Sequence, residues 1–213
     1  MHISAISESA LVCSLPAPAC LPHQRLLWGF ADNIQHWDAR FEVVIGMNNV
    51  TIFTDQETDL NKLTEQLHHI WQQAQAADYQ GKHIEIPVCY GGEYGEDLQE
   101  VANYHQVSIQ EIIKRHTAPI YTVFMMGFQP GFSYLGGLPE NLHTPRRAVP
   151  RTLVPAGSVG IGGSQTGMYP FASPGGWQII GRTDIELFQA NSTSPTLLTA
   201  GDTVQFVAKE IFQ

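Results

Sequence analysis

Four arginines stand in a part of the sequence that has no acidic residue. The segment from 141 to 183 contains no aspartate or glutamate, and its arginines are Arg146, Arg147, Arg151 and Arg182. It therefore carries a local charge of +4 in a chain whose formal net charge is −9. Guanidinium groups bind carboxylates and phosphates through paired hydrogen bonds. We expect an anion-binding site here; the alternative is that the arginines are solvated side chains on a turn-rich barrel.

Residues 127–181, which contain three of these arginines and end next to Arg182, are rich in glycine and proline. Twelve of the 19 glycines and seven of the 13 prolines lie in this window. Such a composition excludes a long helix and predicts short strands joined by rigid turns, where binding groups are often placed. Ten polar or amphipathic side chains in the window are candidate site residues: Gln129, His143, Arg146, Arg147, Arg151, Ser158, Gln165, Thr166, Tyr169 and Trp177.

Several common kinds of catalytic site are missing from the sequence. His68 and His69 are adjacent on a predicted helix, where neighbouring side chains diverge by about 100°, so they do not converge on one metal. There is no HExxH motif, no GxxxxGK[ST] phosphate loop and no GxSxG nucleophile elbow. We therefore expect no bound metal, no phosphate loop of this type and no serine nucleophile.

The composition also limits the partners and the compartment. A sequence pI of about 5.4 argues against general nucleic-acid binding, which needs a broad basic surface. The three cysteines are irregularly spaced and indicate neither a disulfide framework nor a zinc site, so a reduced, cytoplasmic setting is the default. No segment approaches the roughly 20 apolar residues of a membrane span, and the N-terminus lacks the basic region of a signal peptide. We expect a cytoplasmic protein that does not bind membranes.

Residues 1–85 are predicted to form an α+β domain. The predicted helices cover 23–37 and 60–71, and the second begins at a cap formed by Thr58 or Asp59. Two helices on one face of a small antiparallel sheet bury both kinds of element. We expect a ferredoxin-like arrangement, whose predicted strands are 2–6, 10–15, 41–45, 50–54 and 83–88.

Residues 86–213 are predicted to form a second, mostly-β domain. Ser108 and Glu111 have the spacing of a capping box at the start of a short helix, which follows another predicted helix at 96–105. Residues 117–126 are predicted to form an apolar strand. Many short strands with glycine and proline turns follow, and these predict a closed or nearly closed β-barrel.

Several motifs of this chain resemble the family that contains the B-type subunit of 5-oxoprolinase. The family is also described as KipI-like, or as allophanate hydrolase subunit 1. The resemblance extends over essentially the whole chain, and the N-terminal part contributes Gly46-Met47-Asn48-Asn49. The other matching motifs are Gly127-Phe128-Gln129-Pro130-Gly131-Phe132, His143-Thr144-Pro145-Arg146-Arg147, Val154-Pro155-Ala156-Gly157-Ser158-Val159-Gly160-Ile161-Gly162-Gly163, Gln165-Thr166-Gly167 and Pro174-Gly175-Gly176-Trp177.

The resemblance implies a fold, partners and a reaction. It implies that the barrel is cyclophilin-like and that the chain works with a larger barrel partner, the C-type subunit. Together they would activate 5-oxoproline with ATP, and the A-type subunit would complete ring opening to glutamate. ATP would be shared with the partner, and the chain alone is expected to be inactive. A related two-barrel arrangement occurs in urea carboxylase, so the alternative is a component that processes a urea-derived amide (an allophanate-type substrate).

Within this hypothesis, the candidate residues take different roles. One or more of Arg146, Arg147 and Arg151 are expected to pair with the substrate carboxylate or the developing phosphate, with Arg147 as the catalytic one. Gln129 and Gln165 would polarise the amide carbonyl, and His143 would transfer protons. Backbone N–H groups of residues 160–163 would also polarise the carbonyl. The expected substrate-binding residues are Asn48, Arg146, Arg151, Ser158, Gly162, Gln165, Thr166, Tyr169 and Trp177.

Two further function classes compete with the enzyme subunit. One is a regulatory protein that inhibits a sensor histidine kinase, as the KipI-like family name indicates. The other is a peptidyl-prolyl isomerase, which only the expected barrel fold suggests, and fold analogy is a weak argument for function. The intact glycine, proline and arginine motifs favour the enzyme subunit, because an inhibitor would need only a surface patch.

Overall fold

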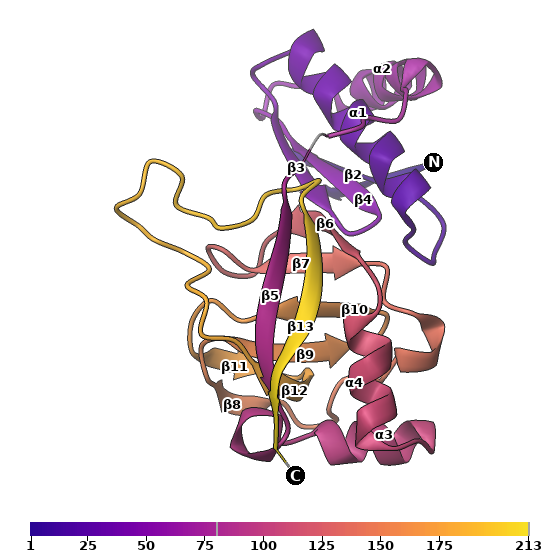
Figure 1. Cartoon of the computed structure of the whole chain (residues 1–213). Helices are drawn as coiled ribbons and strands as arrows, with labels where there is room; N and C mark the ends of the chain where they lie inside the picture. The colour runs from indigo at the N-terminus through magenta and orange to yellow at the C-terminus, as the bar shows by residue number, and fades with distance from the viewer. Residues whose placement is uncertain (80, 213) are drawn as a thin grey trace. The chain divides into compact units, whose positions relative to one another are not determined.

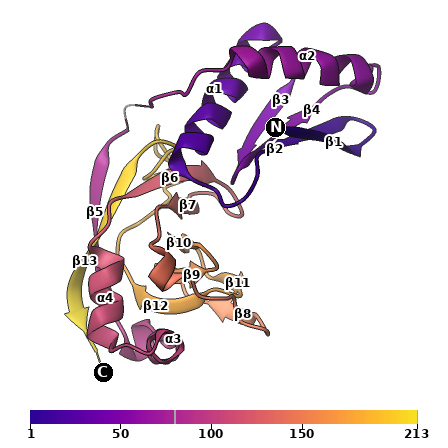
Figure 2. The same ribbon diagram turned by 90° about the vertical axis from the view of Figure 1, so that its right-hand side faces the viewer.

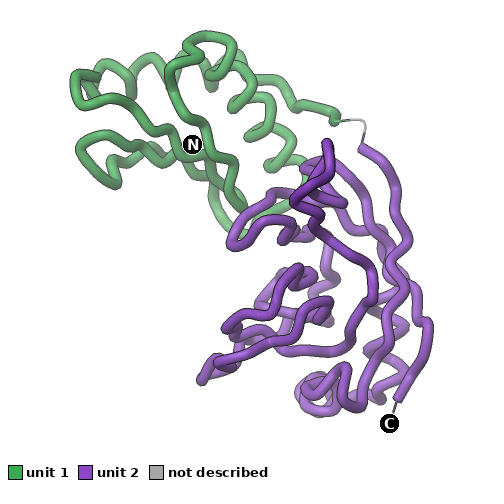
Figure 3. Tube along the Cα trace, turned by 90° about the vertical axis from the view of Figure 1, so that its left-hand side faces the viewer, with its two compact units in different colours: residues 1–79 green, residues 80–213 purple. Residues whose placement is uncertain are grey.

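The computed structural model describes residues 1–79 and 81–212, and the chain divides into two compact units (Figure 3). The first unit covers residues 1–79 and the second covers 80–213. None of the helices in the described part of the chain has the length and apolarity that crossing a bilayer requires.

The first unit is a four-stranded antiparallel sheet with two helices (Figure 1). Its sheet has the strand order β1-β2-β4-β3. Leu27, Phe30 and Ile34 of α1 repeat at helical spacing, and they are buried in one core with Val50 and Ile52 of the sheet. The elements in chain order are β1 (His2–Ser7), β2 (Ala10–Ser14), α1 (Leu21–Trp37), β3 (Glu42–Gly46), β4 (Asn49–Phe53) and α2 (Leu60–Gln73).

The predicted cap of α2 is confirmed. Asp59 is the N-cap residue, and its Oδ1 accepts hydrogen bonds from the backbone N–H groups of Asn61 at 3.0 Å and Lys62 at 3.3 Å. These contacts satisfy two of the N–H groups that the first turn of a helix leaves without partners.

The strand predicted at 83–88 does not belong to the first unit. It is β5 (His83–Tyr90), and it pairs with β12 (Gln178–Arg182) and β13 (Thr203–Ile211) in the second unit. Placing this strand in an N-terminal domain of residues 1–85 was therefore wrong, and a boundary at 85/86 would cut through β5. A β-α-β-β-α-β ferredoxin-like motif needs a strand after its second helix. In this unit the fourth strand of the sheet is β1, at the start of the chain, in place of a strand after α2. A ferredoxin-like domain is therefore not confirmed.

The second unit is a closed barrel of seven strands in the order β10-β7-β6-β13-β5-β12-β9, and the prediction of a mostly-β barrel is confirmed. β5 and β13 run parallel side by side (Figure 1), whereas the other neighbouring strands are antiparallel. The remaining barrel strands are β6 (Tyr121–Met126), β7 (Ser133–Gly136), β9 (Ser158–Gly162) and β10 (Gln165–Met168).

Two helices and a small ribbon accompany the barrel. α3 (Leu98–His105) and α4 (Ile109–Thr117) contact each other and lie near the end of the C-terminal strand (Figures 1 and 2). The predicted cap of α4 is confirmed, because the Ser108 hydroxyl accepts from the Glu111 N–H at 3.2 Å. β8 (Arg151–Val154) and β11 (Ser173–Gly175) form a separate two-stranded sheet. Two 3-10 turns, η1 (Gly92–Tyr94) and η2 (Glu140–Leu142), complete the unit.

A buried histidine ties α4 to the barrel core. The Thr166 hydroxyl donates to the carbonyl oxygen of Gly160 at 2.9 Å, so it accepts from Nε2–H of His116, also at 2.9 Å. Since a neutral imidazole has one donor and one acceptor, Nδ1 of His116 accepts from the hydroxyl of Tyr90 at 2.8 Å. Burial lowers the pKa of His116 to about 3.

We expect this histidine to make the fold sensitive to acid. In the unfolded chain the imidazole titrates near pH 6.5, so between that pH and about 3 the unfolded state binds a proton that the folded state excludes. The free energy of unfolding should therefore fall as the pH drops below 6.5, with a slope of up to about 1.4 kcal/mol per pH unit from this group. Urea unfolding at several pH values measures the slope. His116→Gln should flatten it, whereas the exposed control His69→Gln should keep it; equal slopes in both variants would contradict the assignment.

Candidate anion-binding site

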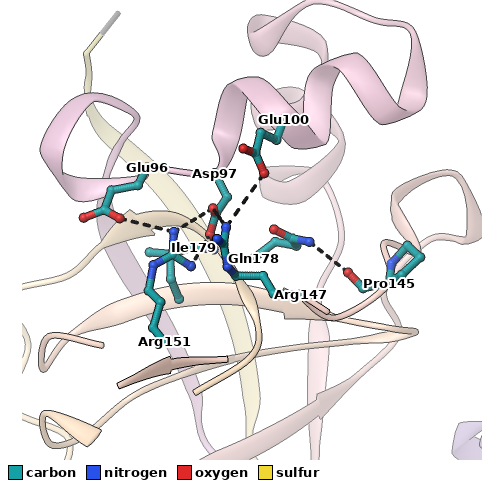
Figure 4. Close-up of polar contacts among 8 residues, drawn as sticks. All are labelled: Glu96, Asp97, Glu100, Pro145, Arg147, Arg151, Gln178 and Ile179. Atoms are coloured by element: carbon teal, nitrogen blue, oxygen red, sulfur yellow. Dashed lines mark hydrogen bonds and ion pairs between the residues drawn. The ribbon is translucent and has the colours of Figure 1, made fainter. Parts of the chain in front are cut away.

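A buried aspartate at the start of α3 gathers two of the four arginines (Figure 4). Asp97 is 1 % exposed. Its carboxylate accepts from Nη1 of Arg147 at 2.6 Å and from Nη1 and Nη2 of Arg151 at 2.8 and 2.7 Å. It also accepts from the backbone N–H of Ile179 in β12, at 2.6 Å. One carboxylate thus joins α3, β8, β12 and the segment that contains Arg147.

Two exposed carboxylates flank the Asp97 cluster, which we define as Asp97, Arg147, Arg151 and the Ile179 N–H. Oε2 of Glu96 lies 3.2 Å from Arg151, and Oε2 of Glu100 lies 3.8 Å from Arg147. The hydrogen bond to Asp97 raises the pKa of Arg151, so this guanidinium stays charged. Segment 141–183 has no acid in its sequence, but the fold brings acids to it from residues 96–100.

The guanidinium groups of Arg147 and Arg151 therefore already bind carboxylates of the chain itself. A buried carboxylate with several charge-assisted hydrogen bonds fixes the groups that surround it. The geometry gives these two arginines a positional role, since they anchor the turn that carries Arg146. Direct contact of Arg147 or Arg151 with a substrate stays a prediction.

Arg146 differs from its two neighbours because no carboxylate in the described residues lies within ion-pairing distance of it. Its side chain is exposed, and its guanidinium carbon lies 5.9 Å from the ring centre of the buried Trp177. A cation over an indole face is stabilised without losing its hydrogen-bond donors. The backbone on either side is held as well, since Arg147 N–H donates to the Gly176 carbonyl at 2.7 Å. Arg146 is thus a positioned cation whose guanidinium makes no hydrogen bond or ion pair to the residues that the structure describes.

The aromatic cluster beneath Arg146 consists of Phe132, Tyr134, Tyr169 and Trp177. The ring centres of Phe132, Tyr134 and Tyr169 lie 5.5, 6.0 and 6.4 Å from that of Trp177. Burial raises the pKa of Tyr134, and the nearby charge of Arg146 opposes this increase. These rings belong to a small core that is separate from the main barrel core.

Gly162 serves as the support of Trp177. A Cβ atom added at Gly162 would collide with the indole ring, and one at Gly167 would lie 3.2 Å from it. Only glycine leaves this space, so the glycines of β9 and β10 let the indole lie against the barrel wall. That Gly162 binds substrate stays a prediction. In the structure, Gly162 leaves room for the Trp177 indole, and this ring in turn positions Arg146.

A hollow of about 260 Å³ lies beside Arg146, between α3 and the segment that begins at Thr144. The amide Nε2 of Gln178 donates to the Pro145 carbonyl at 3.0 Å and ties β12 to this segment (Figure 4). We call this space the α3 hollow. Its lining residues are Glu100, Val101, Tyr104, Thr144, Pro145, Arg146 and Gln178.

Gln129 lies at a different hollow. This second space, of about 450 Å³, has a mostly apolar lining that includes Phe128, Gln129 and Phe188. Phe128 is 60 % exposed and has a φ of 68°, which is a strained value for a bulky residue. Gln129 and Arg146 therefore line separate spaces, although both were expected at one site.

The other predicted site residues are dispersed. Thr166 is buried, and its hydroxyl is hydrogen-bonded to His116. Nε2 of His143 lies 3.0 Å from the Leu138 carbonyl oxygen.

Three further predicted residues also lie apart from Arg146. The Ser158 hydroxyl is buried and has no hydrogen-bond partner among the residues described, while Gln165 is half-buried on β10. Asn48 belongs to the first unit, where its amide donates to the carbonyls of residues 15 and 16. Their roles in binding stay predictions.

Sequence reasoning missed several residues of this region. Tyr104 and Gln178 line the same hollow as Arg146, and Asp97 binds the adjacent Arg147. These three residues lie outside segment 141–183 or carry no motif. Asp97 is 50 positions before Arg147 in the sequence, so no local count of charge could pair them. Phe128 was part of a quoted motif, yet its strained backbone becomes visible only in the fold.

Comparison with known families connects this geometry to a class of proteins. Residues 1–198 match the family described as carboxyltransferase domain, subdomain C and D. The chain belongs to this family. The match extends over most of both units, including the Asp97 cluster and Arg146.

Members of the carboxyltransferase-domain family similar to this chain include curated proteins named as B-type subunits of 5-oxoprolinase. One, from Haemophilus influenzae, is 60 % identical over 211 residues, which are 99 % of this chain and 99 % of that protein. Another, from Escherichia coli O157:H7, is 46 % identical over 206 residues and covers 96 % of this chain and 94 % of that protein. The family resemblance expected from the motifs is confirmed.

A solved structure shares the fold at low sequence identity. The urea carboxylase of Kluyveromyces lactis aligns with a TM-score of 0.79 and 18 % identity, over 99 % of this chain. The aligned part is only 22 % of that longer protein. This similarity shows that the same fold occurs within a larger carboxylase, and it shows nothing about substrate.

Proposed function

We propose that this chain is the B-type subunit of an ATP-dependent 5-oxoprolinase. It would act with a larger barrel partner, the C-type subunit, and with the A-type subunit, which completes ring opening. Identity of 60 % over the full length of a protein named as a 5-oxoprolinase B-type subunit supports this assignment. The structural observation that carries it is Arg146, an exposed and positioned guanidinium that no described carboxylate neutralises.

In the proposed reaction, Arg146 binds the carboxylate of 5-oxoproline. Water adds to the ring carbonyl carbon, the ring C–N bond breaks, and the nitrogen takes up the proton released from water to become the amine of glutamate. The Asp97 cluster holds Arg146 in place during these steps, because it fixes the adjacent residue Arg147 and the facing strand β12. His143 and Gln129 remain proposed as the groups that transfer protons and polarise the carbonyl.

The described residues do not form a recognisable site for the triphosphate of ATP. Arg147 and Arg151 bind Asp97, and the Gly163 N–H donates to the Thr144 carbonyl at 2.8 Å. The 160–163 segment also lies in β-pairings, so it lacks the free row of N–H groups found in a phosphate loop. We therefore derive no step through ATP on this chain, and the proposal assigns most of its binding to the partner.

Reconstitution tests the proposed function. The chain is combined with the C-type and A-type subunits encoded by the same organism, and 5-oxoproline-dependent release of phosphate and glutamate is measured. We expect turnover that disappears when this chain is omitted. A folded complex that shows no turnover would contradict the proposal, and inhibition of a sensor histidine kinase by the chain would then favour the regulatory alternative.

A further inference from the structure

Three different kinds of group line the α3 hollow. Arg146 supplies a positive charge with free donors, and Tyr104 supplies an aromatic ring that is 59 % exposed. Glu100, across the hollow on α3, supplies a carboxylate that is 70 % exposed. Such a set can recognise a small molecule by its anionic end, by a flat face and by an N–H donor.

The arrangement of these groups is held rigidly. Asp97 opens the helix that carries Glu100 and Tyr104, and it binds Arg147, the neighbour of Arg146. It also binds the N–H of Ile179, next to Gln178, which in turn bonds to Pro145 (Figure 4). Both walls of the hollow are therefore anchored to one buried carboxylate. A site whose walls are fixed in advance loses little entropy when a ligand binds.

We propose that the α3 hollow binds a small ring that carries a carboxylate next to an N–H group. Arg146 binds the carboxylate, Glu100 accepts from the ring N–H, and the ring lies against Tyr104. The identification of this ligand as 5-oxoproline rests on the proposed function, since its lactam N–H is bonded to the carbon that bears the carboxylate. Neither the hollow nor the roles of Glu100 and Tyr104 follow from the motifs of the segment around Arg146.

The two hollows of this unit would treat such a ligand differently. The α3 hollow has a free guanidinium, whereas the mostly apolar hollow at Gln129 includes no arginine or lysine in its lining. Transfer of a carboxylate from water to an uncharged apolar space is unfavourable unless a cation compensates for it. The charge of the ligand therefore selects the α3 hollow.

Titration of the full chain followed by ¹H–¹⁵N NMR tests this site without ATP or partner proteins. With 5-oxoproline we expect saturable shifts of amides on both walls, at residues 100–105, 144, 146 and 147. Loss of one charge-assisted contact weakens binding about tenfold or more. We therefore expect that weakening with Arg146→Gln, with 2-pyrrolidinone, which lacks the carboxylate, and with the lactone analogue 5-oxotetrahydrofuran-2-carboxylate, which lacks the N–H.

Matched variants separate this site from a general electrostatic effect. Arg182→Gln removes another arginine of the same segment, one that lies over Tyr94 and outside the α3 hollow, and should leave binding unchanged. Tyr104→Ala should weaken binding while leaving the melting temperature within error, because the ring is mostly exposed. Unchanged affinity in Arg146→Gln, shifts confined to residues around Gln129, or no saturable shift up to the solubility limit of 5-oxoproline would each overturn the site.

The two proposals can fail separately. Binding at the α3 hollow in the titration, together with a folded complex that does not hydrolyse ATP in response to 5-oxoproline, would overturn the proposed function and retain the site. Turnover by the complex, with a KM for 5-oxoproline that Arg146→Gln and Tyr104→Ala leave unchanged, would overturn the site and retain the function.

Discussion

Replacing Asp97 with asparagine is expected to lower the free energy of unfolding by about 3 kcal/mol, because it removes the one buried carboxylate that pairs with Arg147 and Arg151. The substitution preserves the shape of the side chain, so the loss reports charge and hydrogen bonding rather than a cavity. Urea denaturation monitored by circular dichroism measures it.

Glu96→Gln is the matched control for Asp97→Asn. Glu96 also pairs with Arg151, at 3.2 Å, but it is 60 % exposed. An exposed ion pair contributes up to about 1 kcal/mol, so this variant should stay close to the wild type. Equal stability of the two variants would show that the Asp97 cluster is not the anchor of this region.

The second large effect concerns activity. Arg146→Gln in the reconstituted complex should reduce kcat/KM for 5-oxoproline by about tenfold to a hundredfold, since a hydrogen bond to a charged group contributes about 1.5–3 kcal/mol. The KM for ATP should change little. Because Arg146 makes no ion pair within the described chain, the melting temperature should fall only by the small contribution of its contact with Trp177.

Arg146→Lys is the informative companion. Lysine keeps the charge but loses the planar pair of donors that matches a carboxylate. We expect it to recover part of the activity lost in Arg146→Gln. Full activity in both variants would mean that the carboxylate of the substrate binds elsewhere.

Much of the local structure could be predicted from the sequence. The caps at Asp59 and Ser108 depend on neighbouring residues, and both are confirmed. The apolar face expected for the first helix was Leu26, Leu27, Phe30, Ile34 and Trp37; Leu27, Phe30 and Ile34 are buried, whereas Trp37 is 45 % exposed at the end of the helix. The barrel was also predictable, since short strands between glycine and proline turns have few other ways to bury their apolar faces.

The errors came from contacts between distant parts of the chain. The residues of β5 indicate a strand, but they do not say that its partners are β12 and β13, more than 80 residues later. The same limitation applies to segment 141–183, because the carboxylates that pair with its arginines belong to residues 96–100. A count along the sequence found four arginines without acids, whereas the fold pairs Arg147 and Arg151 with carboxylates. Neither Arg146 nor Arg182 has an ion pair among the described residues, and of these two only Arg146 is exposed beside the α3 hollow.

The most direct test of this account compares Arg146→Gln with Arg147→Gln in one reconstituted complex, with kcat/KM for 5-oxoproline and the melting temperature of the chain measured for each. We predict that Arg146→Gln loses activity and keeps its stability, whereas Arg147→Gln loses stability because Asp97 loses a partner at 2.6 Å. The opposite pattern, with Arg146→Gln fully active and Arg147→Gln stable but inactive, would contradict the account and restore Arg147 as the residue that contacts the substrate.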